Sequence, residues 1–261
     1  MTTSAGVDLH VEAGVARITL GKPDKLNALD APMIAALGAA AATIDADRSV
    51  RVAILTGSGK AFCAGGDIAA WGALDPLSMG QGWVRDGHRA FDALARLKVP
   101  LIAALNGHAL GGGLELAATA DFRIAEEGAK FGLPETGIGI VPGWSGTQRL
   151  VTRFGGRAVR RLALGGEIVT AAEALALGLV DAVVPKGESL AAAQAWAERI
   201  GKRGPVATTV TKQLINAAED EDRAATLEIL AGALISATED LKEGVASFRE
   251  KRAPAFKGHQ P

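Results

Sequence analysis

Hydrophobic residues in the first two thirds of the chain gather into short runs, separated by turn residues and helix-like stretches. The runs at Val15–Leu20, Val50–Thr56 and Leu101–Asn106 are short and apolar, which is typical of buried strands. After the first run, Asp30 is a suitable N-cap for an alanine-rich helix that reaches about Ile44. Strands that alternate with helices predict an α/β fold with a largely parallel sheet.

The pattern changes near residue 190, where strand signals end and helical periodicity continues to the C-terminus. We therefore predict a core over residues 1–195 and a helical region over residues 196–261. Within the core, Trp71–Gly87 follows neither period, and we expect this segment to be irregular and mobile. The next stretch, Arg89–Leu97, is expected to be helical.

Composition and charge narrow the class of protein. The 261 residues are 48% hydrophobic and carry a net charge of −1, which argues against a general nucleic-acid-binding surface. The single cysteine, Cys63, excludes an internal disulfide framework and a cysteine zinc cluster. The histidines lack metal-ligand spacing, and neither a secretory signal nor a bilayer-spanning run is visible. We expect a cytoplasmic protein that binds no metal, no nucleic acid and no membrane.

Three consecutive glycines, Gly111–Gly113, stand at the start of an apolar helical stretch that contains Glu115. Glycine lets the backbone approach a ligand closely, and the first turn of a helix offers unpaired N–H groups to negative charge. A second carboxylate, Glu135, follows on a predicted loop. Because paired carboxylates can move protons, this combination indicates chemistry on an oxyanion.

A second glycine pair, Gly65-Gly66, also follows a predicted strand. Taken alone, this pair predicts only a turn. Together with Gly111–Gly113, however, it could aim two backbone N–H groups at one oxygen atom, which is how an oxyanion hole is built. Gly143–Thr147 resembles the nucleophile elbow of serine hydrolases but lacks its final glycine.

Several of these residues also have plainer interpretations. Glu115 could face solvent, although its helix offers almost no polar face, and a buried carboxylate is costly unless it is bonded or neutralised. We interpret Cys63 as a small buried filler and His108 as a packing or hydrogen-bonding residue at a strand end.

Seven segments carry a resemblance to a known family. They are Asn27–Leu29, Gly57–Ile68, Asn106–Leu116, Phe131–Glu135, Pro142-Gly143, Gly146–Leu150 and Phe248–Pro254. Their order and spacing run nearly from end to end, and on them the chain resembles the crotonase (enoyl-CoA hydratase/isomerase) superfamily. The resemblance implies a spiral of ββα units followed by a C-terminal helical trimerisation region. It also implies a homotrimer, or a hexamer made of two trimers, that binds acyl-CoA thioesters.

The resemblance also implies a set of site residues. The backbone N–H groups of Gly66 and Gly112 would form the oxyanion hole for the thioester carbonyl. The residues placed along coenzyme A and the acyl group are Lys25, Leu26, Ala28, Ala64, Asp67, Ile68, Leu110 and Trp144. Lys251, with Phe248, matches a tail position that can reach the nucleotide bound by a neighbouring subunit. Coenzyme A is part of the substrate, so no separate cofactor is implied.

Hydratases of the family carry glutamates at the positions of Glu115 and Glu135, and both are present here. The resemblance therefore favours a hydro-lyase that converts 2-enoyl-CoA to 3-hydroxyacyl-CoA. Glu115 would be the base that orients water, and Glu135 the acid at carbon 2. The alternatives are a Δ3,Δ2-enoyl-CoA isomerase and a catalytically inactive acyl-CoA-binding protein. The division of labour between the glutamates and the pathway stay open.

Trp144 departs from the family pattern, in which a small residue is common at this position. Its ring either fills the acyl end of the pocket, which would favour short or branched substrates, or serves only as packing.

Overall fold

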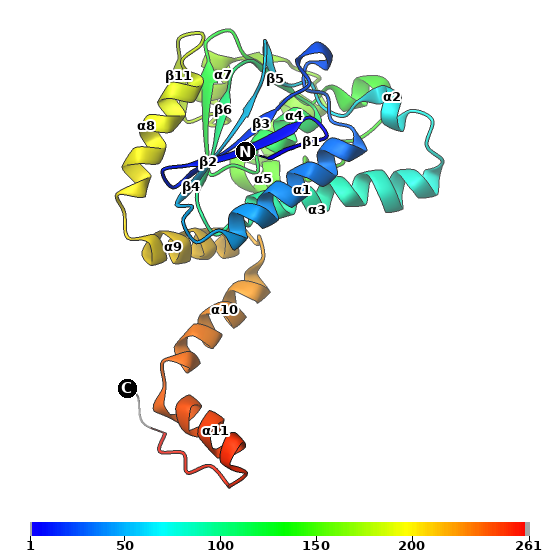
Figure 1. Ribbon diagram of the computed structural model, residues 1–261. Helices are drawn as coiled ribbons and strands as arrows, with labels where there is room; N and C mark the ends of the chain where they lie inside the picture. The colour runs from blue at the N-terminus through cyan, green and yellow to red at the C-terminus, as the bar shows by residue number, and fades with distance from the viewer. Residues whose placement is uncertain (1, 259–261) are drawn as a thin grey trace. The chain divides into compact units, whose positions relative to one another are not determined.

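The computed structural model describes residues 2–258 and contains two β-sheets with helices around them (Figure 1). The larger sheet has seven strands in the order β1-β2-β3-β4-β6-β8-β11. From β3 onward its neighbours are parallel, whereas β1, β2 and β3 pair antiparallel. The strands are β1 (Thr2–Ser4), β2 (Val7–Glu12), β3 (Val15–Leu20), β4 (Val52–Gly57), β6 (Leu101–Leu105), β8 (Phe122–Glu126) and β11 (Ala182–Val184). The predicted α/β class is confirmed.

The second sheet has four strands in the order β10-β9-β7-β5. They are β5 (Ala61–Cys63), β7 (His108–Leu110), β9 (Lys130–Gly132) and β10 (Val169–Thr170). Successive strand pairs, β4 with β5, β6 with β7 and β8 with β9, each give one strand to each sheet. The chain therefore winds as a spiral, and the segments that follow β5 and β7 lie next to each other.

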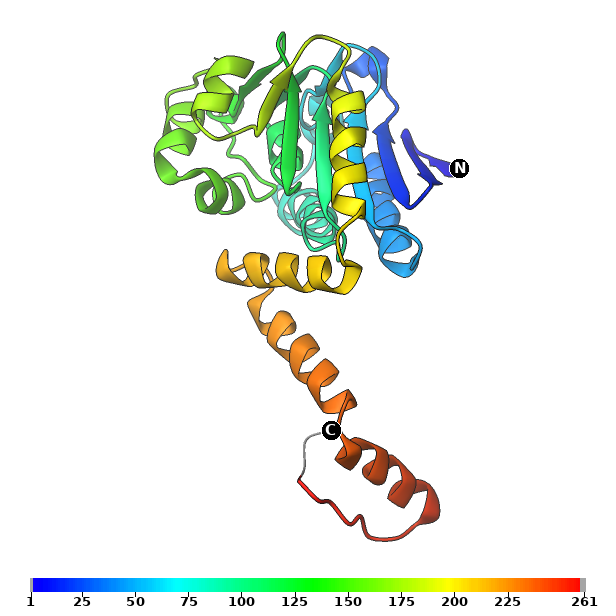
Figure 2. The same cartoon turned by 90° about the vertical axis from the view of Figure 1, so that its left-hand side faces the viewer.

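The central strands of the larger sheet are covered on both faces, which explains their unbroken apolar sequences. In β4, Ala53 and Leu55 face the main core with α1 (Ala31–Ala46), whereas Val52 and Ile54 face α8 (Ser189–Gly201). Figure 2 shows α8, the yellow helix, lying alongside the strands and nearly parallel to them. The other helices are α2 (Ile68–Trp71), α3 (Arg85–Ala95), α4 (Gly112–Ala117), α5 (Arg149–Phe154), α6 (Gly156–Ala163), α7 (Ala171–Ala176), α9 (Pro205–Ala218), α10 (Arg223–Ser236) and α11 (Glu239–Glu250).

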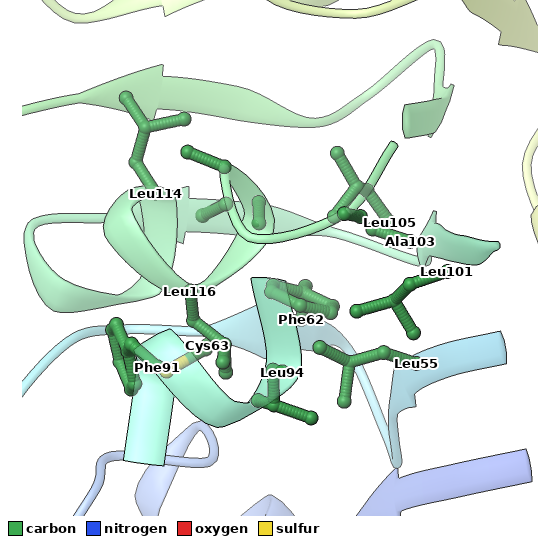
Figure 3. Close-up of a cluster of buried hydrophobic side chains, with 14 of the residues drawn as sticks. Leu55, Phe62, Cys63, Phe91, Leu94, Leu101, Ala103, Leu105, Leu114 and Leu116 are labelled. Carbon is green, nitrogen blue, oxygen red and sulfur yellow. The ribbon is translucent and has the colours of Figure 1, made fainter. Parts of the chain in front are cut away.

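A tightly packed part of the core supports the helix that carries the glycine triplet. Figure 3 shows Leu116 of α4 projecting toward Cys63, with Phe91 of α3 beside Cys63 and Leu114 at the top of the cluster. All of these side chains are almost completely buried. Because interiors are packed as densely as organic crystals, α4 has little freedom to shift relative to β5 and α3.

Local signals predicted several elements well. The strand at Val15–Leu20 is confirmed, and so is the helix cap at Asp30, whose carboxylate accepts the N–H of Met33 at 3.1 Å. The prediction for Trp71–Gly87 was wrong, because this segment contains a π-helical stretch, Ser78–Val84, that runs directly into α3. Its glycines and irregular apolar spacing hide the helical period.

The described residues separate into two compact units, with the division between Lys212 and Gln213. The first unit contains both sheets and α8, and the second contains α10 and α11. The division falls later than the predicted boundary at residue 195, because α8 packs on β4, β6 and β8. The oligomerisation role assigned to residues 196–261 stays a prediction.

Asn27 holds together the turns around the first glycine pair. It is fully buried and has a left-handed backbone with a φ of 55°. Its side-chain amide donates to the carbonyls of Ser58 and Ala61, both at 2.9 Å, and accepts the N–H of Lys22 at 2.9 Å. One side chain thus links the turn after β3 to the loop that leads into β5.

Replacing Asn27 with alanine is expected to destabilise the chain by about 3 kcal/mol, because buried polar groups lose their partners and alanine disfavours a left-handed backbone. Asn27→Gly removes the same hydrogen bonds without the backbone penalty, so its loss should be smaller. Urea unfolding of both variants measures the two contributions. Wild-type stability in Asn27→Gly would show that the hydrogen bonds contribute nothing.

Candidate active site

Two backbone amides meet at the ends of neighbouring strands. Gly65 and Gly111 have positive φ angles of 104° and 54°, which turn the chain sharply after β5 and β7. A Cβ atom built on Gly112 would lie 3.5 Å from the amide nitrogen of Gly66, and one built on Gly65 would lie 3.3 Å from the amide nitrogen of Gly112. Within residues 2–258, neither the Gly66 nor the Gly112 N–H has a hydrogen-bond acceptor. Both donors remain available to a ligand.

These amides open into a cavity of about 580 Å³. Its polar groups are few, and most of its wall is apolar, which is typical of a small-molecule site. The predicted site residues in its lining are Ala64, Gly66, Ile68, Gly112, Glu115, Glu135 and Trp144. The glycine pair, the glycine triplet and both glutamates therefore meet at one place.

Glu115 projects from α4 into this cavity and is only 2% exposed. The solvent-facing interpretation is therefore wrong. Its Oε1 accepts the backbone N–H groups of Trp144 and Gly146, both at 2.7 Å. Gly146 must be small, because a Cβ atom there would come within 2.5 Å of the same oxygen. The other oxygen, Oε2, is not engaged by these two donors.

Glu135 reaches the cavity from the 3₁₀ turn Pro134–Ile138 and is 7% exposed. Its Oε1 lies against Gly111, where an added Cβ would be 2.8 Å away. Its Oε2 is buried and has no hydrogen-bond partner in the described part of the chain. A buried carboxylate oxygen without a partner is costly, so it is an indication that a ligand or water binds there.

Both carboxyl groups have raised pKa values. Burial, together with the negative charge of Glu135, raises the pKa of Glu115 to about 8, although the two amide donors oppose this rise. Burial also raises the pKa of Glu135. Since two nearby carboxylates resist double ionisation, we expect the pair to hold about one proton near neutral pH.

The loop that binds Glu115 is fixed by α3. Ser145, between the two amide donors, has a φ of 78°, and its Oγ lies 3.0 Å from Nδ1 of His88. One turn further along α3, Asp92 accepts a hydrogen bond from Arg149 at 2.7 Å. Helix α3 therefore holds this loop at two points, Ser145 and Arg149. Through the loop, α3 also positions the carboxylate of Glu115.

The segment assigned to coenzyme A runs beside the first glycine pair. Lys25 forms an ion pair with Asp67 at 2.8 Å, which lowers the pKa of the Asp67 carboxyl. The carbonyl of Leu26 accepts the N–H of Ala64 at 3.0 Å, and Ala28 follows, half-buried. These residues form one continuous edge next to the cavity.

The other assigned residues are spread more widely. Leu110 ends β7, and its carbonyl lies against Gly65, where an added Cβ would be 3.0 Å away. Phe248 and Lys251 belong to the second compact unit, where Phe248 is 86% exposed and Lys251 ends α11 with a left-handed backbone. Their proposed contact with a nucleotide stays a prediction.

Trp71 and Trp83 are among the cavity residues that escaped the sequence analysis. Both lie in the stretch that was expected to be irregular, where no periodic signal points to a common face. The sequence does carry one signal that could have drawn attention to them, because two of the chain's four tryptophans fall within thirteen residues, 71–83.

The interpretations of Cys63 and His108 are confirmed. Cys63 is buried, and burial raises the pKa of its thiol to about 12, which makes it an inert filler. His108 accepts the N–H of Lys130 through Nδ1 at 3.1 Å. In the part of the chain that the structure describes, no group of three or more His, Cys, Asp or Glu side chains is arranged to hold a metal. None of the helices described within residues 2–258 is long and apolar enough to cross a membrane.

Comparison with known proteins gives a consistent result. The family model described as "Enoyl-CoA hydratase/isomerase" matches residues 10–259. A crotonyl-CoA hydratase of Syntrophomonas wolfei is 39% identical over 251 residues, which cover 95% of this chain and 96% of that protein. An (E)-benzylidenesuccinyl-CoA hydratase of Thauera aromatica is 38% identical over 256 residues, covering 97% and 99%. The crystal structure of an enoyl-CoA hydratase from Bacillus anthracis is similar with a TM-score of 0.79, 35% identity, and coverage of 97% and 100%. These matches confirm the expected crotonase fold.

Raising the pH is expected to weaken the folded wild-type chain through Glu115. The raised pKa means that this carboxyl stabilises the folded state fully below pH 4.5, and that the stabilisation is lost as the pH rises through about 8. Glu115→Gln cannot ionise, so the unfolding free energy of the wild type relative to this variant should fall across that window. Urea unfolding at about pH 5 and about pH 8 measures the difference. A difference that is independent of pH would contradict the raised pKa.

Proposed function

The chain belongs to the enoyl-CoA hydratase/isomerase family, and on this premise we propose that it adds water to the double bond of 2-enoyl-CoA thioesters. One observation carries the proposal: two buried glutamates and two unpaired backbone amides line the same cavity. Two carboxyl groups fit a reaction that must both activate a water molecule and deliver a proton.

The two amides would stabilise the charge that develops during the reaction. When hydroxide adds at carbon 3, negative charge moves to the thioester oxygen as an enolate forms. The N–H groups of Gly66 and Gly112 would donate to this oxygen, and one such donor typically lowers the barrier by about 3–4 kcal/mol. Because α4 has only six residues, we assign the effect to these two amides rather than to a long helix dipole.

The glutamates would divide the proton transfers between them. In the free chain, burial and the charge of Glu135 raise the pKa of Glu115 to about 8, which favours a proton on Glu115 near neutral pH. We assign the base to Glu115 in the substrate complex, after this proton has passed to Glu135, because the two amide N–H groups at Oε1 of Glu115 would stabilise its negative charge. Its Oε2 would take a proton from water, whose oxygen then bonds to carbon 3. Glu135, which has a buried Oε2 without a protein partner, would supply the proton to carbon 2. The product is the 3-hydroxyacyl thioester.

The remaining sequence assignments extend this proposal along the substrate. Lys25, Leu26, Ala28, Ala64, Asp67 and Ile68 would guide the coenzyme A portion to the oxyanion hole, supported by their position beside Gly66. Relatives named for crotonyl-CoA and for (E)-benzylidenesuccinyl-CoA carry very different acyl groups, so their names do not define the acyl group used here.

Glu115→Gln and Glu135→Gln are each expected to lower the kcat of crotonyl-CoA hydration by about 100-fold or more, because general acid–base groups contribute factors of this size. The loss of absorbance of the enoyl thioester measures the rate. Glu127→Gln is the matched control, since Glu127 is exposed and lies outside the cavity lining. Near wild-type turnover in either variant would remove that glutamate from the mechanism.

The same assay distinguishes hydration from double-bond migration. Hydration in water labelled with oxygen-18 should place the label on the 3-hydroxyl group of the product. Conversion of a 3-enoyl to a 2-enoyl thioester without any label would favour the isomerase instead. If the chain binds acyl-CoA but turns over neither substrate, the inactive binding protein becomes the better description.

We also propose that the chain assembles as a trimer or as two trimers. In the second compact unit, Leu227, Ile229 and Leu234 of α10 are all exposed in the single chain. Exposed apolar groups of this kind are typical of surfaces that bind another subunit.

Light scattering should therefore give a mass three or six times the chain mass of 26.6 kDa. The apolar side chains of α10 would be covered in such an assembly, which would offset the cost of exposing them to water. A mass of one chain at micromolar concentration would contradict the proposed assembly.

A further inference from the structure

The catalytic cavity concentrates an uncommon residue type. Aromatic residues make up only 4% of the chain, which has four tryptophans and no tyrosine. Three of those tryptophans, Trp71, Trp83 and Trp144, line the cavity. They come from α2, from the π-helical stretch and from the loop that binds Glu115, so three separate segments each place an indole there.

The three indoles converge on the oxyanion hole. A Cβ atom built on Gly66 would lie 3.0 Å from Trp83, 3.3 Å from Trp71 and 3.4 Å from Trp144. The rings of Trp83 and Trp144 are tilted by 46°, with 5.0 Å between their centroids. The acyl group of a thioester whose oxygen reaches Gly66 and Gly112 would therefore lie against indole rings.

This aromatic wall, formed by Trp71, Trp83 and Trp144, is rigid where it meets Glu115. The indole N–H of Trp144 donates to the carbonyl of Trp83 at 3.2 Å, and Phe91 packs against the Trp144 ring with 5.3 Å between centroids. A side chain at Gly87 would overlap the Trp144 ring. The position of the Trp144 ring is thus fixed by a hydrogen bond, by an aromatic contact and by the space that Gly87 leaves for it in α3.

Rigid aromatic walls discriminate between acyl groups by shape. A planar aryl group conjugated with the enoyl double bond loses little conformational freedom on binding and offers its faces and edges to the indoles, with a gain of roughly 2- to 10-fold per ring contact. A linear alkyl chain of similar size must order several single bonds to fill the same space. The wall has no charged side chain and no hydroxyl group to bind a charged or hydroxylated acyl terminus, and its polar atoms are the indole nitrogens.

We infer that the aromatic wall selects 2-enoyl thioesters with an aryl group on carbon 3 over linear alkyl thioesters of similar size. This specificity deepens the proposed hydration and rests on it. The specificity-determining residues are Trp71, Trp83 and Trp144. The backbone N–H of Trp144 also donates to Glu115, so this residue both lines the wall and positions a glutamate.

The kinetic test compares 3-hydroxy-3-phenylpropanoyl-CoA with 3-hydroxyoctanoyl-CoA. Conjugation with the ring disfavours hydration at equilibrium, so the rates are measured as dehydration. The aryl substrate should have a kcat/KM about tenfold higher or more. Trp83→Leu should lower this ratio about fivefold, whereas Trp196→Leu should leave it unchanged. Trp196 is the matched control because this tryptophan of α8 packs against Phe122 of β8 and lies outside the cavity.

A binding test separates this inference from the proposed hydration and needs no variant. Calorimetry on the full chain compares 3-phenylpropanoyl-CoA with octanoyl-CoA, which are saturated and cannot be hydrated. We expect the aryl thioester to bind about tenfold more tightly. Tighter aryl binding without any hydration would preserve the inference and overturn the proposed function. Hydration of crotonyl-CoA with equal or tighter octanoyl binding would preserve the proposed function and overturn the inference.

Discussion

The site depends on one oxygen atom, Oε1 of Glu115, which accepts the amides of Trp144 and Gly146. A carboxylate in an apolar helix would otherwise be too costly to bury. The same two bonds bring the loop after the 3₁₀ turn onto α4 and carry the Trp144 ring into the cavity. Glu115, the loop and the Trp144 ring are therefore parts of one arrangement, and α3 holds that arrangement through His88 and Asp92.

The spiral explains why residues far apart in sequence meet here. Strands β5 and β7 are neighbours in the smaller sheet, so the turns that follow them place Gly66 beside Gly112. Their amides are unpaired because each turn leaves its strand before the next regular hydrogen-bonding pattern begins. Parallel strands that end at the same edge of the sheet thus bring two unpaired amides together, and glycine leaves the space beside them free of side chains.

Features encoded by adjacent residues could be predicted from the sequence. The strand Val15–Leu20 and the cap at Asp30 depend on local periodicity and local hydrogen bonds. The burial of Glu115 could be predicted because its helix has no polar face. By contrast, the grouping of Trp71 with Trp83 depends on a π-helical turn and on contacts across the cavity, which no local period encodes. Which acyl group fits is determined by such long-range packing.

The fit of Gly87 against Trp144 links two positions on different elements. Neither can vary freely while the other is kept, because a larger residue at 87 needs a smaller ring, and loss of the ring leaves a void beside α3. A substitution at either position is therefore tolerated only together with a matching change at the other. Residue 87, which is buried in α3, thus limits the size of the ring that position 144 can carry.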